Sequence, residues 1–335
     1  MKEALVSKGP SVEIIDNPIP TPGPDQVLIR VIVSGTNPKD WKVPEWTDRT
    51  DNQGDDIAGI VAAVGDNVTE FKPGDRVAAF HQMMELHGSY AEYAISWQHT
   101  TFHIPKSTSF EAMTSAIALY HHLGLPEPWR PATSSSSIPL VIYGGATAVG
   151  AFAIQMAVKS NIHPIITVAG RGIPFVESLI DRSKGDTIVD YRKGDEFVVS
   201  EIKNALKAFG SDETLLHAFD GVSEGSSITN LGKVVSQGGK IAFVLPVEDD
   251  ALPAGINKAK TNVGCVHADQ KDFGFVHFRY IAKGLLDGWF KPHPHEVVPG
   301  GLGGLQQALT DLKNGKASAV KYVVRVGETQ GVIAS

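Results

Sequence analysis

A strand-like apolar run that ends in a glycine-rich turn is the feature that most restricts the fold of this chain. Residues 140–143 read Leu-Val-Ile-Tyr, and a helical pattern starts within the next few residues and continues through Ala153 and Gln155. Strand, turn and helix in this order open a βαβ unit, in which small residues let the backbone approach a pyrophosphate and the helix N-terminus offers N–H groups. From this segment we predict a dinucleotide site that includes Gly144, Gly145, Ala146, Thr147, Ala148 and Val149.

The fingerprint is imperfect at one position. Thr147 stands where the motif G-x-G-x-x-G has its middle glycine, between Gly145 and Gly150. Such a match is weak by itself, and it is the strand before it and the helix after it that support a binding function. The alternative, a tight turn that binds no ligand, stays open.

Strands and helices alternate regularly after this turn. The apolar runs predict strands at 139–143, 163–169, 187–190, 215–219 and 240–245. The helical periods predict helices at 148–160, 175–183, 195–208 and 226–235. This alternation is typical of the α/β class, with a doubly wound parallel sheet and right-handed crossovers.

The first hundred residues are instead rich in short strands and turns, which suggests a partly open barrel. The strands are expected at 27–33, 57–64, 76–79 and 90–95, and a helix at 110–123 follows. The tail holds two expected helices, at 275–287 and 305–314, and a strand at 319–326. Because this tail is too short for a domain, we expect it to complete the barrel. The expected domains are therefore a β-rich one, formed by 1–107 and 273–335, and an α/β one, formed by 108–272.

The end of the second α/β strand indicates which dinucleotide binds. An NAD site has an acidic residue about 20 residues after the glycines, bonded to the ribose hydroxyls. Here residues 167–172 read Thr-Val-Ala-Gly-Arg-Gly, and no acid occurs before Glu177. Arg171 is placed to meet a 2′-phosphate with a charged, forked donor, so NADPH is the predicted cofactor; a solvated loop charge is the alternative. The expected pocket also includes Gly170 and Tyr191, with Arg192 and Lys184 as further candidates.

Charge and composition exclude several classes of function. The net charge of −7 and the pI near 5.9 argue against a general binder of nucleic acids or anionic membranes. The single cysteine, Cys265, cannot form an intramolecular disulfide or a cysteine-rich zinc lobe. No apolar run reaches the ~20 residues that span a bilayer, and the N-terminal residues show neither a signal peptide nor a transit peptide. We therefore expect a cytoplasmic protein without nucleic-acid or membrane partners.

With these features the chain resembles the medium-chain dehydrogenase/reductase superfamily, in particular its zinc-independent quinone reductases and fungal trans-acting enoyl reductases. The resemblance covers nearly the whole length. The matching segments are residues 37–42 (NPKDWK), 54–61 (GDDIAGIV), 71–77 (FKPGDRV), 88–93 (GSYAEY), the glycine turn and 187–192. The resemblance implies a GroES-like catalytic domain beside a Rossmann domain, in agreement with the pattern above.

The chain departs from the zinc-dependent members of this superfamily at their metal ligands. Those members carry a cysteine where this chain has Asn37, and a His-Glu pair where it has Asp55 and Asp56. Zinc is held by cysteine, histidine or carboxylate ligands in tetrahedral geometry, which two aspartates alone cannot supply. We therefore expect no metal site.

Without a metal, another group must stabilise the negative charge that develops on the acceptor oxygen. The resemblance points to Lys42, which takes the position of a proton-relay histidine of zinc-dependent members; a solvated loop lysine is the alternative. Asn37 is a second candidate that holds the nicotinamide ribose or the acceptor, or only forms an Asn-Pro turn. By the same resemblance, the backbone of Phe243, Val244 and Leu245 meets the nicotinamide carboxamide.

These features together favour an NADPH-dependent, zinc-independent oxidoreductase that passes a hydride to a small-molecule quinone or α,β-unsaturated carbonyl. One alternative is a trans-acting enoyl-thioester reductase of polyketide or fatty-acid type. Another, from a different class, is a non-catalytic NADPH-binding structural or sensor protein. The sequence leaves open the physiological acceptor and whether the chain forms a homodimer.

Overall fold

A computed structural model describes residues 1–104, 111–133, 137–210 and 214–332 of the chain. The chain divides into two compact units, Met1–Phe110 with Gly264–Ser335, and Glu111–Val263. The expected first boundary, at 107/108, lies outside the described residues. The second division falls between Val263 and Gly264, whereas we expected it after residue 272. The segment from 264 belongs to the first unit because the ring of His267 packs on Phe80, with ring centroids 5.1 Å apart.

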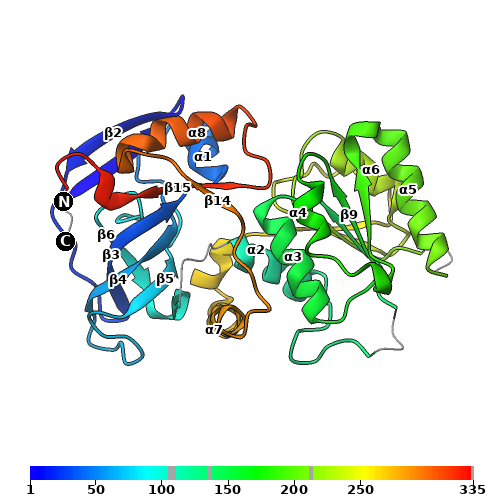
Figure 1. Ribbon diagram of the computed structural model, residues 1–335, viewed down its shortest axis with the longest axis horizontal. Helices are drawn as coiled ribbons and strands as arrows, with labels where there is room; N and C mark the ends of the chain where they lie inside the picture. The colour runs from blue at the N-terminus through cyan, green and yellow to red at the C-terminus, as the bar shows by residue number, and fades with distance from the viewer. Residues whose placement is uncertain (105–110, 134–136, 211–213, 333–335) are drawn as a thin grey trace. The chain divides into compact units, whose positions relative to one another are not determined.

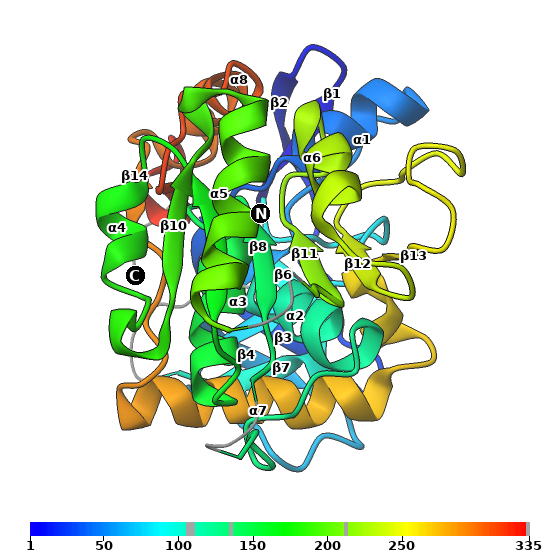
Figure 2. The ribbon, with the colours of Figure 1, turned by 90° about the vertical axis from the view of Figure 1, so that its right-hand side faces the viewer.

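The described residues of the second unit form a parallel sheet with the strand order β10-β9-β8-β11-β12-β13 (Figure 2). The strands are β8 (Leu140–Tyr143), β9 (Ile165–Ala169), β10 (Thr187–Asp190), β11 (His217–Asp220), β12 (Lys240–Phe243) and β13 (Asn257–Lys260). The chain adds β9 and β10 on one side of β8, and then β11, β12 and β13 on its other side. That reversal, between β8 and β11, is the place where doubly wound sheets bind ligands.

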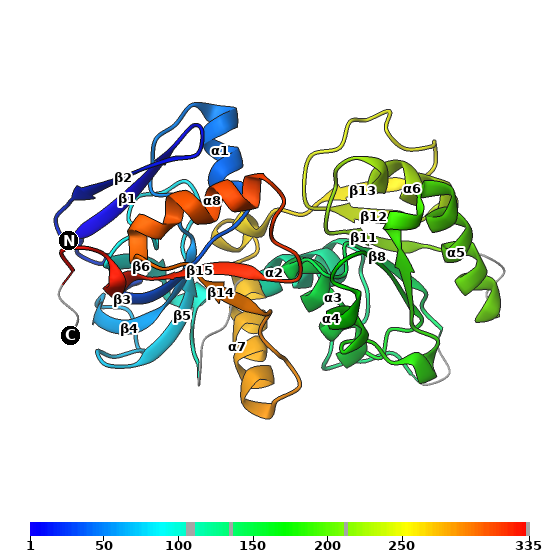
Figure 3. The ribbon, with the colours of Figure 1, turned by 45° about the horizontal axis from the view of Figure 1, so that its top comes forward.

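Helices cover both faces of this sheet. The helices are α2 (Glu111–Ala116), continued by the π-helical turn η2 (Ile117–His122), α3 (Ala148–Lys159), α4 (Ile173–Glu177), α5 (Asp195–Ala208) and α6 (Ser226–Val234). α2, α3 and α4 lie on one face, and α5 and α6 on the other (Figures 1 and 3). α5 buries Val198, Ile202 and Leu206, a four-residue spacing that aligns them along one helix stripe. The doubly wound α/β fold expected from the sequence is confirmed.

The first unit is mainly antiparallel. Its strands are β1 (Lys2–Ser7), β2 (Ser11–Asp16), β3 (Gln26–Gly35), β4 (Asp56–Val64), β5 (Arg76–Phe80), β6 (Tyr93–Trp97), β7 (Thr101–His103), β14 (His295–Val297) and β15 (Lys321–Arg325). They form a β1–β2 hairpin and a sheet in the order β14-β15-β3-β4-β5-β7, with β6 paired to β3 (Figure 1). Because β15 pairs with β3, the C-terminal segment completes this unit.

In the described part of the first unit the α-helices are α1 (Lys39–Thr47), α7 (Lys271–Asp287) and α8 (Leu305–Lys313). Its short 3-10 turns are η1 (Gln98–Thr100), η5 (Val263–His267, at the boundary of the units), η6 (Gly301–Gly304) and η7 (Val326–Glu328). The second unit has the 3-10 turns η3 (Arg182–Lys184) and η4 (Tyr191–Lys193). Within the residues that the structure describes, no helix is both long and apolar enough to cross a bilayer.

Among the expected elements whose bounds differ from the structure, one helix and one strand have a local reason. The helix expected at 175–183 is α4, which ends at Glu177, because Asp181 caps a separate turn by accepting a hydrogen bond from the backbone N–H of Ser183. The strand expected at 90–95 begins only at Tyr93, since the N–H of Tyr90 donates to the side chain of Asn52 rather than to a neighbouring strand.

Candidate functional site

The glycine turn after β8 is held in shape by Thr147. This residue is the N-cap of α3, and its hydroxyl accepts a 3.0 Å hydrogen bond from the N–H of Gly150. The same hydroxyl donates to the carbonyl of Gly144 at 2.8 Å. A threonine is a favoured N-cap because its oxygen satisfies one of the N–H groups left over by the first helical turn. Thr147 therefore replaces the middle glycine of the motif with a capping residue.

Three glycines of this turn are needed for different reasons. Gly144 has a φ of +82°, which side chains of L-residues rarely adopt. A Cβ on Gly145 would lie 2.0 Å from Oγ1 of Thr167, and one on Gly150 would lie 2.2 Å from the carbonyl oxygen of Gly144. The turn therefore brings bare backbone and the positive end of α3 to the carboxyl end of β8, as a bound pyrophosphate requires.

The loop after β11 packs on the same turn. Asp220 is fully buried at the end of β11 and accepts hydrogen bonds from the N–H groups of Val222 and Ser223 and from the hydroxyl of Ser227. A Cβ on Gly221 would lie 3.1 Å from the side chain of Val149. Burial raises the pKa of Asp220. Asp220 was not expected from the sequence, and it fixes the second loop at the strand-order reversal.

The residues expected around a 2′-phosphate lie after β9 and β10. Gly170 and Tyr191 are brought together, since a Cβ on Gly170 would lie 2.5 Å from the ring of Tyr191. The side chain of Arg171 is exposed. Arg192 is engaged locally instead, because its guanidinium binds Asp190 through two hydrogen bonds of 2.6 and 2.8 Å. This pairing lowers the pKa of Asp190 to about 2.

The end of β12 forms a small pocket. Phe243 and Leu245 line it together with Pro246, Val247, Lys258, Ala259 and Lys260. The N–H of Val244, expected to face the cofactor, donates a 2.9 Å hydrogen bond to Oγ of Ser223. The loop after β11 therefore also supports the backbone that follows β12.

The first unit holds a buried cluster of charged side chains around the start of α1. Nζ of Lys39 lies 2.5 Å from Oδ2 of Asp55 and 3.3 Å from Oδ1 of Asp40, and it donates to the carbonyl of Gln53 at 2.6 Å. Burial opposes its charged form, but the carboxylates of Asp55 and Asp40 outweigh burial and raise the pKa of Lys39. An ammonium whose pKa is raised retains its proton, so Lys39 compensates charge and is a poor acid.

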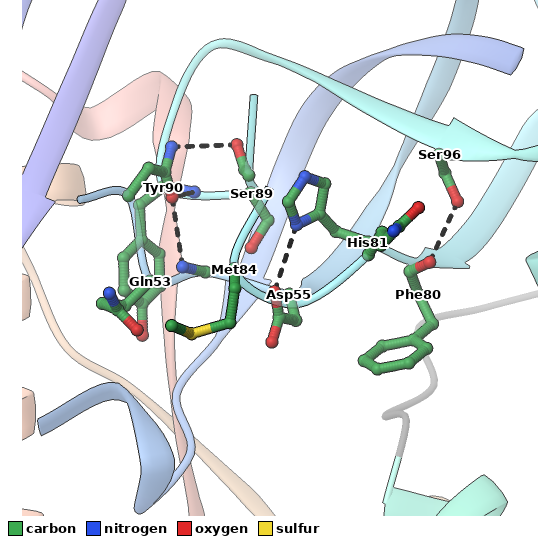
Figure 4. A network of polar contacts seen from close by, with 12 residues as sticks. Gln53, Asp55, Phe80, His81, Met84, Ser89, Tyr90 and Ser96 are labelled. Atoms are coloured by element: carbon green, nitrogen blue, oxygen red, sulfur yellow. Dashed lines mark hydrogen bonds and ion pairs between the residues drawn. The ribbon is translucent and has the colours of Figure 1, made fainter. Parts of the chain in front are cut away.

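Tyr90 and His81 complete this cluster. The Tyr90 hydroxyl donates to Oδ2 of Asp40 at 2.5 Å. Nδ1 of His81 lies 3.1 Å from Oδ1 of Asp55 (Figure 4). Burial by itself would raise the pKa of Asp55, but Lys39 and His81 outweigh burial and lower this pKa. Burial raises the pKa of Asp40 to about 6, despite the opposing effect of Lys39. A continuous chain of contacts therefore joins Tyr90, Asp40, Lys39, Asp55 and His81, in this order.

Another lysine, Lys321, is buried against Asp56. Lys321, at the start of β15, places Nζ 2.7 Å from Oδ2 of Asp56 and donates a 2.9 Å hydrogen bond to Oδ1 of Asn37. The adjacent residues Asp55 and Asp56 are therefore each paired with a different lysine. Among the described residues, no group of three or more histidine, cysteine or acidic side chains is arranged to hold a metal ion.

The two expected catalytic residues lie near this cluster in sequence but have different surroundings. Asn37 is half-buried and bonded to Lys321. Lys42 lies on α1, is only 9% exposed, and has Nζ 5.5 Å from the centroid of the Trp41 ring. Lys39 and Lys321 were not expected as site residues. Lys39 lies within the segment NPKDWK, whereas no local pattern marks Lys321.

Comparison with known proteins gives matches to a domain family and to full-length chains. Residues 23–106 match the alcohol dehydrogenase GroES-like domain. The chain is 49% identical to the trans-enoyl reductase fsr4 of Gibberella fujikuroi, over 90% of this chain and 91% of that protein. It is 30% identical to the trans-enoyl reductase ACTTS2 of Alternaria alternata, over 97% and 99%. Among solved structures, mycobacterial Rv1454c complexed with NADPH has the same fold, with a TM-score of 0.73, 19% identity and coverage of 97% and 99%.

Proposed function

The chain belongs to the trans-enoyl reductase family of the medium-chain dehydrogenase/reductase superfamily, and from this premise we propose that it is an NADPH-dependent reductase of enoyl thioesters. The observation that carries the proposal is the 49% identity to a trans-enoyl reductase across nine-tenths of both chains. The enoyl-thioester reaction, an alternative in the sequence analysis, is therefore preferred to the reduction of free quinones or enones. All three acceptors share an activated double bond or quinone that becomes an enolate-like anion.

The glycine turn fits a nicotinamide dinucleotide. Gly145 and Gly150 leave no room for a Cβ, so bare backbone lines the place where a pyrophosphate meets α3. We assign the pyrophosphate to residues 144–149, the 2′-phosphate to Arg171 with Gly170 and Tyr191, and the carboxamide to the backbone of residues 243–245. No acidic residue lies between the end of β9 and Glu177, which supports NADPH over NADH. When bound, the cofactor supplies the hydride, and the protein supplies position and electrostatics.

Residues of the first unit act on the acceptor. The thioester oxygen gains negative charge as the double bond is reduced, and a placed donor stabilises it. We assign the stabilisation of the thioester oxygen to the side-chain amide of Asn37. We assign to Lys42 the donation of a proton to the carbon next to the carbonyl. Lys39 is excluded as that acid because its ammonium is held by Asp55 and Asp40.

An acceptor panel tests the proposal. NADPH oxidation is measured with a short enoyl thioester, the matching enone, a quinone and no acceptor, with NADH in parallel. The expected result is a higher kcat/KM for the enoyl thioester than for the other acceptors, with NADPH preferred. Quinone reduction without thioester reduction would favour the free-quinone alternative. Tight NADPH binding without turnover of any acceptor would favour the non-catalytic alternative.

A further inference from the structure

The C-terminal strand carries an ammonium into the interior of the first unit. Lys321 is only 5% exposed, and the cost of burying a lysine is large unless the charge is paired. Asp56, itself 5% exposed, supplies the opposite charge at 2.7 Å. Because Lys39 already neutralises the neighbouring Asp55, the Lys321–Asp56 pair is a separate feature. The fold therefore keeps a fully buried ion pair beside the half-buried pair of Lys39 and Asp55.

The backbone around this pair is shaped to admit it. β15 runs antiparallel to β3, with Val323 opposite Gly35. A Cβ on Gly35 would lie 2.6 Å from Cε of Lys321 and 2.7 Å from Oδ2 of Asp56. One residue further on, the hydroxyl and the N–H of Thr36 both donate to the carbonyl of Tyr322, at 2.9 and 3.0 Å. These contacts fix the strand next to Asn37 and leave a glycine where the lysine passes.

The bond from Lys321 determines which way the amide of Asn37 faces. An ammonium has donors and no acceptor, so only the amide oxygen of Asn37 can face it. The –NH₂ group of Asn37 therefore lies on the side of the carboxamide away from Oδ1. An asparagine whose oxygen and nitrogen are otherwise interchangeable is converted into a donor of fixed direction.

We propose that Lys321 is a positioning residue, which holds the oxygen of Asn37 so that its –NH₂ group is presented to the acceptor oxygen. The inference rests on the role of Asn37 in the proposed function. Asp56 has an indirect part, because it compensates the charge that Lys321 brings into the interior. Lys321 does not touch the acceptor and transfers no proton.

A double-mutant cycle between Lys321 and Asn37 tests the proposal. The variants are Lys321→Met, Asn37→Ala and the combination, measured with the enoyl thioester that the wild-type enzyme reduces best. Lys321→Met alone is expected to lower kcat by about tenfold or more, the lower part of the range for a misplaced oxyanion donor. In the Asn37→Ala background the same change is expected to lower kcat by less than about twofold, because residues acting through one contact are not additive. NADPH affinity is expected to stay at the wild-type value in all variants.

Two outcomes overturn the inference. Losses that multiply in the combined variant show that Lys321 acts independently of Asn37, and an unchanged kcat in Lys321→Met shows that it does not act at all. If Lys321→Met does not fold because Asp56 is left unpaired, the cycle is run with Lys321→Met/Asp56→Asn, which removes both charges. Failure of the proposed function is seen separately, as a wild-type enzyme that does not reduce the thioester.

Discussion

The hydroxyl of Tyr90 donates a 2.5 Å hydrogen bond to Oδ2 of Asp40, and both side chains are completely buried. The N–H of Asn37 donates to the same carboxylate oxygen at 2.7 Å. Asp40 therefore joins the start of α1 to Tyr90, which precedes β6, and holds the backbone of Asn37 in place. Because this carboxylate is buried, its contribution to the free energy of unfolding depends on pH, and that dependence can be measured.

The first prediction concerns Asp40→Asn. The pKa of Asp40 in the folded protein, about 6, lies above its ordinary value of 3.8 because of burial. Between these values the folded state binds more protons than the unfolded state, so the contribution of Asp40 to stability falls as the pH rises. The variant lacks this titration. Its free energy of unfolding relative to wild type should therefore increase by on the order of 2–3 kcal/mol between about pH 4 and about pH 7.

Chemical denaturation of both proteins across this pH range provides the measurement. A difference in unfolding free energy that does not change with pH would show that Asp40 titrates as in the unfolded chain. A difference that decreases with pH would show that its pKa is lowered in the folded protein.

The second prediction concerns Gly150→Ala. The new Cβ would lie 2.2 Å from a backbone oxygen, so the start of α3 must move away from the glycine turn. Overpacking of this kind typically costs ~1–3 kcal/mol, and NADPH affinity should decrease with it. Gly303→Ala is the matched control, because its Cβ meets nothing within 4 Å, and its unfolding free energy should stay within about 0.5 kcal/mol of wild type. Thermal unfolding and cofactor titration measure the two effects. If Gly150→Ala and Gly303→Ala changed stability and NADPH affinity equally, the assignment of the glycine turn to the cofactor would be contradicted.

The third prediction concerns Arg171→Ala and cofactor choice. A charge-assisted bond to the 2′-phosphate is worth ~1.5–3 kcal/mol, so wild type should bind NADPH at least ~10-fold more tightly than NADH. The variant should lose this preference and leave the affinity for NADH nearly unchanged. Arg192→Ala is the control, since Arg192 is already bound to Asp190 and its removal should change the preference less. Fluorescence titration measures both cofactors, and equal affinities in wild type would refute the role of Arg171.

The fourth prediction concerns Lys42→Ala. Loss of the proton donor that we propose should lower kcat by roughly 10²-fold. NADPH affinity should stay intact, because the residues that we assign to the phosphates belong to the other unit. Lys42→Arg should restore little of the activity, since a guanidinium keeps its proton.

Lys313→Ala is the control, because its Nζ lies 5.6 Å from the centroid of the same Trp41 ring. A surface lysine of this kind contributes little, so that variant should stay within about twofold of wild type. Single-turnover kinetics in which Lys42→Ala equals Lys313→Ala would make Lys42 a bystander.

Much of the fold was predictable because local patterns and tertiary packing agree. The helix expected at 195–208 is confirmed as α5, since Gly194 precedes it and its buried residues keep one helical stripe. The strand β13 was missed because its sequence Asn-Lys-Ala-Lys is polar and lies at the edge of the sheet. The helix α1 was missed because it is preceded by Pro38 and contains Pro44, residues that normally limit helices.

The site was predictable only where its residues are close in sequence. The glycine turn and Gly170 follow from strand-to-helix patterns, and the structure brings Gly170 against Tyr191. The bond from Lys321 to Asn37 joins residues that are 284 positions apart. In the sequence Lys-Tyr-Val-Val-Arg, Lys321 reads as an ordinary strand residue, so its burial depends on strand pairing that no local pattern contains.

The central claim is that the chain reduces an enoyl thioester with a hydride from NADPH. The most direct measurement uses NADPH that carries deuterium at the transferable position, the wild-type enzyme and a short enoyl thioester, with mass spectrometry of the product. The expected product is the saturated thioester with one deuterium at the carbon β to the carbonyl, formed in equal amount to the NADPH consumed. An unreduced thioester in the presence of bound NADPH, or a saturated product without deuterium, would contradict the claim.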